Sequence, residues 1–255
     1  MNLFDKNDIE EKTKLLYEDI HPYTDIEDNI SNYLKTLNIG LDFFKGKDIL
    51  ECGYGGTGWS IEMLVRGEAR SIKGIDLNPK WQKLYQEKYS NVKTDLDLRV
   101  GNLLDLPFED ESVDFATSYG VLHHTLDWEK GIKEMKRVLR PGGMLFIMVY
   151  GRYAPVGRLI NKSLRIAGKV IPKKIMTMIV TKTGLLRDAR LSILDTMYVP
   201  IEGHYSESEV KDFLNSIGIL EVKAYESHKW KNKLLSKPFL FGSNIQTNIS
   251  GLKGY

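Results

Sequence analysis

The sequence has one cysteine, no long apolar run and almost no net charge, and each of these absences excludes something. With Cys52 alone the chain cannot form an intrachain disulfide, and a metal site built from cysteines has too few ligands. No run of about 18 apolar residues occurs, which argues against a membrane-spanning helix. The opening residues, MNLFDKNDIEEK, lack the basic start and apolar core of a signal peptide. We therefore expect a cytoplasmic protein.

The charge is distributed unevenly. The whole chain carries +2, so no overall basic field indicates nucleic acid as a partner. Residues 152–190, however, contain ten Lys or Arg and one acid, a net +9 that leaves −7 on the rest. Apolar residues at helical spacing within this stretch face away from basic ones, so we expect a basic helical insertion. Three roles stay open for it: a solvated lid face, a membrane surface contact, or contact with an acidic substrate.

The rest of the chain predicts an α/β fold. Strands are expected at 48–52, 71–76, 96–100, 113–118 and 144–149, with helices between them, the last of these helices ending at Pro141-Gly142-Gly143. Such alternation implies a parallel sheet with right-handed crossovers. Two amphipathic helices (7–21 and 25–38) precede it. It is followed by a helix that begins at a capping box of Ser206 and Glu209, a strand over 219–225 and a hairpin within 236–255.

This pattern gives four segments. We expect an N-terminal helical lid at 1–40, a ligand-binding core at 41–150, the basic insertion at 151–190 and the completion of the sheet at 191–255. The length suits one domain that carries an insertion, and 42% apolar residues can supply its core.

The segment LECGYGGTG, Leu50 to Gly58, is the centre of the predicted core. Its glycines, among them Gly53, Gly55 and Gly58, let the backbone approach a ligand closely, and the helix that follows presents unpaired N–H groups. Such a loop occurs in nucleotide, dinucleotide and S-adenosylmethionine sites, and ordinary loops imitate it.

Polar residues at three predicted strand ends narrow the choice. Glu51 ends the first strand, Asp76 ends the second, and Gly101-Asn102 follows the third. Ligands of doubly wound sheets bind in the crevice at these ends, and a carboxylate on the second strand can accept both hydroxyls of a ribose. Taken singly, Glu51 could cap the loop and Asp76 could be a turn residue. Together they indicate a ligand that contains adenosine.

Two further motifs carry a family resemblance. DLPFEDESVDFATSYGVLHH at Asp105–His124 and RVLRPGGMLFI at Arg137–Ile147 follow the glycine loop at the order and distance typical of class I S-adenosylmethionine-dependent methyltransferases. The chain resembles in particular the type 11 subgroup, which includes enzymes of ubiquinone and menaquinone biosynthesis. The resemblance covers about residues 47–149. It implies a seven-stranded, mostly parallel Rossmann-like sheet whose last strand is antiparallel.

The resemblance also implies roles for individual residues, with S-adenosyl-L-methionine as cofactor. Glu51, Gly53 and Gly55 would surround its methionine part, near Gly58; Asp76, with Leu77 beside it, would hold the ribose; Asn102 and Leu103 would border the adenine; and the Ser118 carbonyl would accept from the amino group. Two features depart from the family: Asn102 stands where aspartate is usual, and Tyr54 replaces a small residue. Both changes would reshape the pocket.

The catalytic machinery is less defined by the sequence. A methyl acceptor that must lose a proton is helped by a general base, and the candidates are His123, His204 and His21. The other residues expected to overhang the crevice are Tyr17, Tyr23, Glu202 and Tyr205. His123 and His124 lie at a predicted strand-to-helix turn, where a buried structural histidine is the alternative.

We interpret the chain as a methyltransferase that acts on a small-molecule acceptor and not on nucleic acid. The basic and apolar residues of the insertion leave both a lipophilic and an anionic acceptor open. Two other classes stay open: a non-catalytic protein that binds the cofactor, and an NAD-type oxidoreductase, which shares the glycine loop but leaves the later motifs unexplained. The acceptor, the methylated atom and the oligomeric state are left open.

Overall fold

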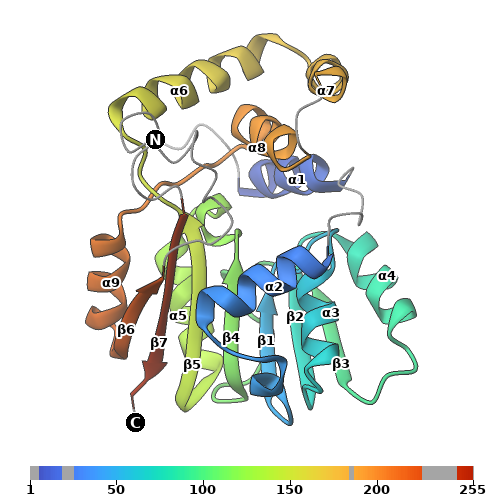
Figure 1. Ribbon diagram of the computed structural model, residues 1–255, viewed down its shortest axis with the longest axis vertical. Helices are drawn as coiled ribbons and strands as arrows, with labels where there is room; N and C mark the ends of the chain where they lie inside the picture. The colour runs from blue at the N-terminus through green and yellow to red at the C-terminus, as the bar shows by residue number, and fades with distance from the viewer. Residues whose placement is uncertain (1–5, 19–25, 184–186, 226–245, 255) are drawn as a thin grey trace.

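A seven-stranded sheet forms the centre of the molecule. The computed structural model describes residues 6–18, 26–183, 187–225 and 246–254. Strand order is β3-β2-β1-β4-β5-β7-β6 (Figure 1), and the first five strands in this order are parallel. The strands are β1 (Asp48–Cys52), β2 (Ser71–Asp76), β3 (Asp95–Val100), β4 (Val113–Tyr119), β5 (Leu139–Tyr150), β6 (Ile219–Tyr225) and β7 (Gln246–Lys253). Only β7 runs antiparallel to its neighbours. The predicted fold class is confirmed.

Helices cover both faces of the sheet. Helices α2 (Ile26–Leu37), α3 (Trp59–Arg66) and α4 (Pro79–Lys88) bury apolar residues in a core on one face; α5 (Trp128–Val138) and α9 (Glu207–Ser216) do so on the other. Side chains of the central strands alternate between these cores: Ile49 enters the first, whereas Leu50 and Cys52 enter the second. The loops at the carboxyl ends of the parallel strands are thereby fixed by a sheet packed on both faces.

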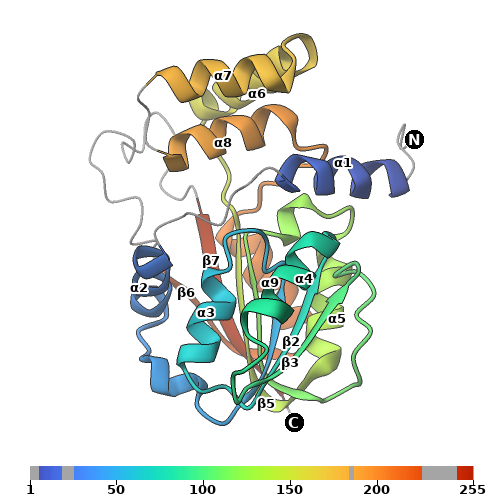
Figure 2. The same ribbon diagram turned by 90° about the vertical axis from the view of Figure 1, so that its right-hand side faces the viewer.

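Four helices lie beyond the carboxyl ends of the strands. They are α1 (Lys6–Glu18), α6 (Pro155–Val170), α7 (Lys173–Lys182) and α8 (Arg187–Tyr198), and we call them the cap. Figures 1 and 2 show α8 and α1 nearer to the sheet and α6 and α7 farther from it. Helices α6 and α7 both pack on α8. No helix within the described ranges is long and apolar enough to cross a membrane.

The cap differs from the predicted segments in two ways. The two N-terminal helices do not form one lid, because α1 belongs to the cap while α2 buries Ile30, Tyr33 and Leu37 against the sheet core. The insertion also continues past residue 190, since α8 runs to Tyr198 and packs under α6. Completion of the sheet therefore starts at α9, where the predicted capping box of Ser206 and Glu209 is present.

Two local predictions were wrong. Helix α5 ends at Val138, before the Pro141-Gly142-Gly143 turn, because Leu139 already pairs with Val113 of β4. The turn residues then form an irregularity in β5, since the next pair is Phe115 with Met144. The C-terminal stretch forms no hairpin of its own in its described part: β7 inserts between β5 and β6. Residues 236–245 of that prediction lie outside the described residues.

Candidate active site

One cavity of about 410 Å³ lies between the strand ends and the cap. At one end it is lined by residues from β1, β2 and their loops, including Glu51, Gly53, Gly55 and Asp76. At the other end it is lined by Tyr17 of α1, Tyr150 at the end of β5, Asp195 of α8 and His124. The cavity therefore joins the predicted ligand crevice to the cap.

Glu51 is a buried acid that faces this cavity without a basic partner among the described residues. Burial raises the pKa of its carboxyl to about 8, although a hydrogen bond from Ser60 opposes the shift, and the charge of Asp76 raises the pKa further. A carboxylate held in this way is stabilised by any cation that enters beside it. The first strand end is thus suited to an ammonium or sulfonium group.

Asp76 faces the same cavity from the next strand. Oδ2 accepts from the Gly55 amide at 2.9 Å and Oδ1 accepts from the Asn78 amide at 2.9 Å. Burial raises the pKa of this carboxyl, although these backbone hydrogen bonds oppose the shift. Each oxygen keeps a lone pair for a further donor. Two fixed acceptors on one carboxylate match the pair of hydroxyls of a ribose.

The glycine loop leaves space where side chains would stand. Gly55 has φ +52°, and a Cβ placed on it would find only the carbonyl of Gly53, at 3.9 Å. A side chain at this position would therefore occupy the cavity. Gly58 has a different role: it has φ +64° and caps α3, and its Cβ would collide with the Tyr85 ring at 2.5–2.7 Å. It does not line the cavity.

Most of the remaining predicted ligand residues line the cavity, and one does not. Leu77, Asn102 and Leu103 line the cavity, whereas Ser118 does not, because it lies within β4 paired with Cys52 and Ile147. Asn102 turns its oxygen to the Leu104 amide and its Nδ2 to Glu10 of α1. The predicted adenine border is therefore attached to the cap.

Tyr54 does not close the crevice. Its ring is buried beside Gly74 of β2, where a Cβ would come within 3.0 Å of it, and it meets Tyr85 edge-on with centroids 6.0 Å apart. The side chain is thus packed in the core beside β2 and lines the cavity. This explains how a large residue is accommodated between two glycines.

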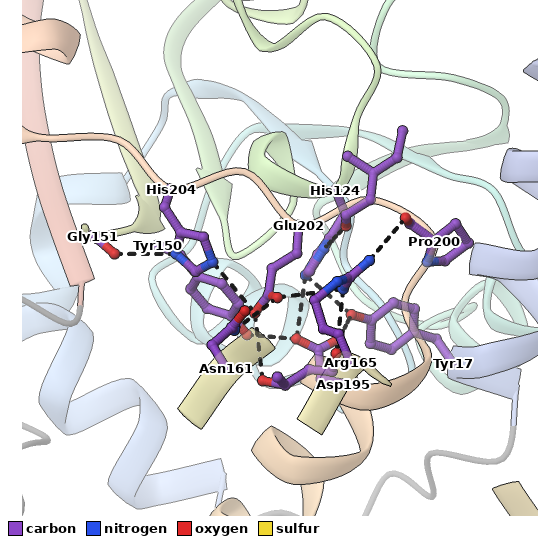
Figure 3. A network of polar contacts seen from close by, with 12 residues as sticks. Tyr17, His124, Tyr150, Gly151, Asn161, Arg165, Asp195, Pro200, Glu202 and His204 are labelled. Atoms are coloured by element: carbon purple, nitrogen blue, oxygen red, sulfur yellow. Dashed lines mark hydrogen bonds and ion pairs between the residues drawn. The ribbon is translucent and has the colours of Figure 1, made fainter. Parts of the chain in front are cut away.

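The cap end of the cavity holds a polar network (Figure 3). The Tyr17 hydroxyl donates to Oδ1 of Asp195, and the Tyr150 hydroxyl donates to Oδ2 at 2.8 Å. Nε2 of His124 lies 3.2 Å from the Tyr17 hydroxyl and 3.6 Å from Asp195. Burial and the charge of Asp195 raise the pKa of both tyrosines, so that both remain neutral donors.

The hydrogen bonds of His124 determine which nitrogen is free. Nδ1 lies 2.8 Å from the carbonyl oxygen of Ile201. A carbonyl can only accept, so Nδ1 carries the proton, and Nε2 of the neutral ring is an acceptor. If Nε2 gains a proton, the carboxylate of Asp195 stabilises the resulting imidazolium. This arrangement can receive a proton from a molecule in the cavity.

Two of the three predicted histidines, His123 and His204, lie away from the lining of the cavity. His123 is fully buried and stacks on Tyr150 with centroids 3.7 Å apart, and neither ring nitrogen has a hydrogen-bond partner among the residues that the structure describes. Burial lowers its pKa, so that it stays neutral. His204 lies behind Tyr150 and Tyr153, with Nδ1 3.2 Å from the Gly151 carbonyl. Neither lines the cavity. His21 lies outside the described residues.

A second cluster supports the network from behind. Glu202, whose side chain is 1% exposed, contacts Asn161 and Arg165 of α6 and lies 3.7 Å from His204. Burial raises the pKa of Glu202, but His204, Asn161 and Arg165 together bring it below its usual value. These contacts hold the segment that supplies the Ile201 carbonyl to His124.

Sequence reasoning gave Asp195 and Tyr150 no role. Tyr150 ends a predicted parallel strand, which is a position that could have been examined for a ligand contact. Asp195 lies in the last two turns of α8, in the segment LSILDTMY, and the sequence gives no sign that it faces Tyr17. Within the described part of the chain, no group of three or more His, Cys, Asp or Glu could hold a metal ion.

Comparisons with known proteins match the part of the chain that contains the glycine loop and Asp76. Residues 50–147 match the family model described as methyltransferase domain. A probable S-adenosylmethionine-dependent methyltransferase of Mycolicibacterium smegmatis is 35% identical over 42% of this chain and 39% of its own length. Demethylmenaquinone methyltransferase of Listeria monocytogenes is 30% identical over 53% of this chain and 61% of its own. The chain thus matches only part of either relative.

Solved structures show the same fold over a longer range. The phosphoethanolamine N-methyltransferase 2 of Haemonchus contortus, in complex with phosphomonomethylethanolamine and S-adenosylhomocysteine, superposes with a TM-score of 0.58. It is 14% identical, and the match covers 100% of this chain and 59% of that one. Residues 50–147 are therefore a methyltransferase domain in a Rossmann-like methyltransferase fold, and the resemblance noted in the sequence is confirmed.

Proposed function

We propose that the protein transfers a methyl group from S-adenosyl-L-methionine to a small-molecule acceptor. The observation that carries this proposal is that Glu51 and Asp76, from neighbouring strand ends, face one cavity whose other end holds the network of Tyr17, His124 and Asp195. A ligand site and a proton acceptor thus share one cavity. The partial matches to named S-adenosylmethionine-dependent methyltransferases support the same assignment.

The residues present fit this cofactor. Glu51 would hold the amino group, Asp76 the ribose hydroxyls, and Asn102 and Leu103 would border the base. When bound, the cofactor supplies a methyl group on a positively charged sulfur. Two buried carboxylates beside the glycine loop favour such a cation. The pyrophosphate of a dinucleotide would instead bring negative charge next to Glu51, which disfavours the oxidoreductase alternative.

At the acceptor end, the chain aligns the nucleophile and takes up its proton. Tyr17 and Tyr150 keep Asp195 in place through two hydrogen bonds, and Asp195 stabilises His124 when Nε2 is protonated. Nε2 of His124 would take up the proton that the acceptor loses when it receives the methyl group. Base assistance of this kind supplies about a hundredfold to ten-thousandfold. Alignment and exclusion of water supply more.

The test has two stages. Titration calorimetry with S-adenosylhomocysteine and with NAD should show binding of the first alone. Release of S-adenosylhomocysteine is then measured over a panel of phenols, quinols, amines and phosphorylated amines. Tight binding without turnover on any acceptor would favour the non-catalytic alternative, and preference for NAD would refute the proposal. A quinol or another lipophilic acceptor, and a cytoplasmic location, stay predictions.

A further inference from the structure

Helices α6 and α7 carry most of the exposed large apolar side chains of the described chain. Eight of the thirteen exposed large apolar side chains lie on Pro155–Val170 and Lys173–Lys182. They are Val156, Leu159, Ile160, Ile166 and Val170 on α6, and Ile175, Met178 and Ile179 on α7. Val170 is 78% exposed and Leu159 is 66% exposed. We call these two helices the roof.

The apolar residues of the roof form stripes on its outer side. Positions 156, 159, 160, 166 and 170 recur at helical spacing and so share one face of α6, as 175, 178 and 179 do on α7. The opposite face of α6 packs against the rest of the protein. A Cβ on Gly168 would lie 2.1 Å from the Met197 carbonyl of α8, and the Arg165 guanidinium donates a hydrogen bond to the Pro200 carbonyl. On α7, Val180 is buried. The stripes therefore point away from the molecule.

Basic side chains accompany these stripes, and acids are absent. Residues 155–182 contain seven Lys or Arg and no Asp or Glu. Five of them, Arg158, Lys162, Lys169, Lys174 and Lys182, form no ion pair within the described residues. On α6, Arg158, Lys162 and Lys169 recur at helical spacing beside the apolar stripe. Each stripe thus has unneutralised positive charge at its border.

This combination identifies the chemistry of the partner. An apolar stripe bordered by lysine and arginine is the pattern of a helix that lies in the interface of an anionic membrane. Protein interfaces favour aromatic residues and are poor in lysine, and single-stranded nucleic acid needs aromatic platforms. The segment 155–182 contains no aromatic residue. Its charge and its apolar side chains are complementary to lipid with negatively charged headgroups.

We propose that the roof docks the protein on an anionic lipid surface. The outer stripes of α6 and α7 enter the boundary between headgroups and acyl chains, and the flanking Lys and Arg contact the headgroups. Helix α8 beneath the roof contributes Asp195 and Ser192 to the cavity, so docking places the acceptor end of the cavity near the lipid. The docking itself does not depend on the proposed methyl transfer.

The test is flotation of the full chain with vesicles of phosphatidylcholine, with or without phosphatidylglycerol. Binding should require phosphatidylglycerol and fall as salt rises. The variant R158Q/K162Q/K169Q should lose about a hundredfold in partition, since each charge near the surface contributes roughly a fivefold factor. Its matched control, K35Q/K83Q/K93Q, removes three exposed charges from the body of the protein and should stay within about twofold.

A second pair of variants tests the apolar stripe. L159Q/I166Q should lose at least about tenfold in partition, whereas L84Q/L220Q, at exposed apolar positions outside the roof, should not. Thermal melts identify any variant that fails to fold. Equal binding to both vesicle types, no binding, or equal losses in the controls would overturn the proposal. So would light scattering that finds a dimer in wild type and a monomer in L159Q/I166Q.

Titration with S-adenosylhomocysteine separates this proposal from the proposed function. All four variants should bind it as wild type does, because none of the changed residues lines the cavity. A chain that binds vesicles but not S-adenosylhomocysteine would refute the proposed methyl transfer and leave the docking proposal standing.

Discussion

The two ends of the cavity differ in how far apart in the chain their residues lie. The strand end draws on Glu51, the glycine loop and Asp76, all within a short stretch in which strand and loop geometry place each group. The cap end joins Tyr17 of α1 to Asp195 of α8, which are 178 positions apart and meet only in the folded chain. One end is a local motif, whereas the other is a product of tertiary packing.

The two ends also differ in electrostatics. At the strand end, two buried carboxylates lack a basic partner in the described chain and have raised pKa values. A cationic ligand would therefore offset the free-energy cost of burying their negative charge. At the cap end, two hydroxyls donate to the carboxylate of Asp195, and His124 lies within reach of it. The first end is built to bind charge and the second to move a proton. Variants should therefore separate binding from turnover.

The largest expected effect is on turnover at the cap end. His124→Gln should lower kcat about a hundredfold to ten-thousandfold, because it removes the acceptor for the proton of the substrate. The dissociation constant for S-adenosylhomocysteine should stay within about threefold. Turnover is measured with the acceptor found in the panel. His204→Gln is the matched control, since His204 does not line the cavity; equal losses in both variants would contradict the assignment.

At the strand end, Glu51→Gln should change how stability depends on pH. Below pH 4.5 the Glu51 carboxyl is protonated in the folded and unfolded states alike. Between 4.5 and about 8 only the folded state keeps the proton, so wild type loses stability as pH rises, and the loss is complete above 8. The free energy of unfolding of the variant, relative to that of wild type, should therefore rise on the order of 4 kcal/mol between pH 4.5 and 9.

Urea unfolding at pH 5 and pH 9 measures this difference. The control is Glu87→Gln, an exposed acid on α4, whose effect should be small and the same at both values. If Glu51→Gln behaved like this control, Glu51 would not be a buried, uncompensated acid. That result would also contradict the proposal that Glu51 holds the amino group of the cofactor.

Asp76→Asn should weaken binding of S-adenosylhomocysteine by about tenfold to a hundredfold. The reason is that hydrogen bonds to a charged group contribute about 1.5–3 kcal/mol, and the variant lacks the charge and one acceptor. Calorimetric titration measures the dissociation constant for S-adenosylhomocysteine. Asp95→Asn, at the exposed opposite end of the neighbouring strand, should have no effect. A variant of Asp76 that lowered kcat without changing affinity would reverse the contrast between the two ends.

The strand end of the cavity could be predicted from the sequence to a larger extent than the cap end. The order of strands, the glycine loop and the meeting of Glu51 with Asp76 follow from the rule that parallel strands end at one edge. Ser118 could not be excluded from the sequence alone, because its neighbours Tyr119 and Gly120 do line the cavity. Whether β4 ends before or after residue 118 depends on its pairing with β5.

The cap end could not be predicted for a physical reason. His123 and His124 are adjacent in a 3-10 turn, Leu122–His124, and only the packing of Tyr150 and Ile201 determines which ring reaches the cavity. The pairing of Asp195 with Tyr17 has no signal in local periodicity. The end of α5 was predicted wrongly for a similar reason: Leu139 pairs with β4, so the helix ends at Val138, before Pro141-Gly142-Gly143.

The smallest effect expected is at the contact between α1 and α8. Tyr17→Phe removes one donor from Asp195 and the hydroxyl beside His124, while the ring still fills its place. The net contribution of one such hydrogen bond is about 1 kcal/mol, so kcat/KM should fall about fivefold to tenfold with unchanged affinity for S-adenosylhomocysteine. Tyr198→Phe is the matched control, because its hydroxyl also ties the cap together, by donating to the Ile171 carbonyl, but does not line the cavity. An equal loss in Tyr198→Phe would mean that Tyr17 acts through packing of the cap, and a loss in Tyr17→Phe alone would assign the effect to the hydroxyl in the network.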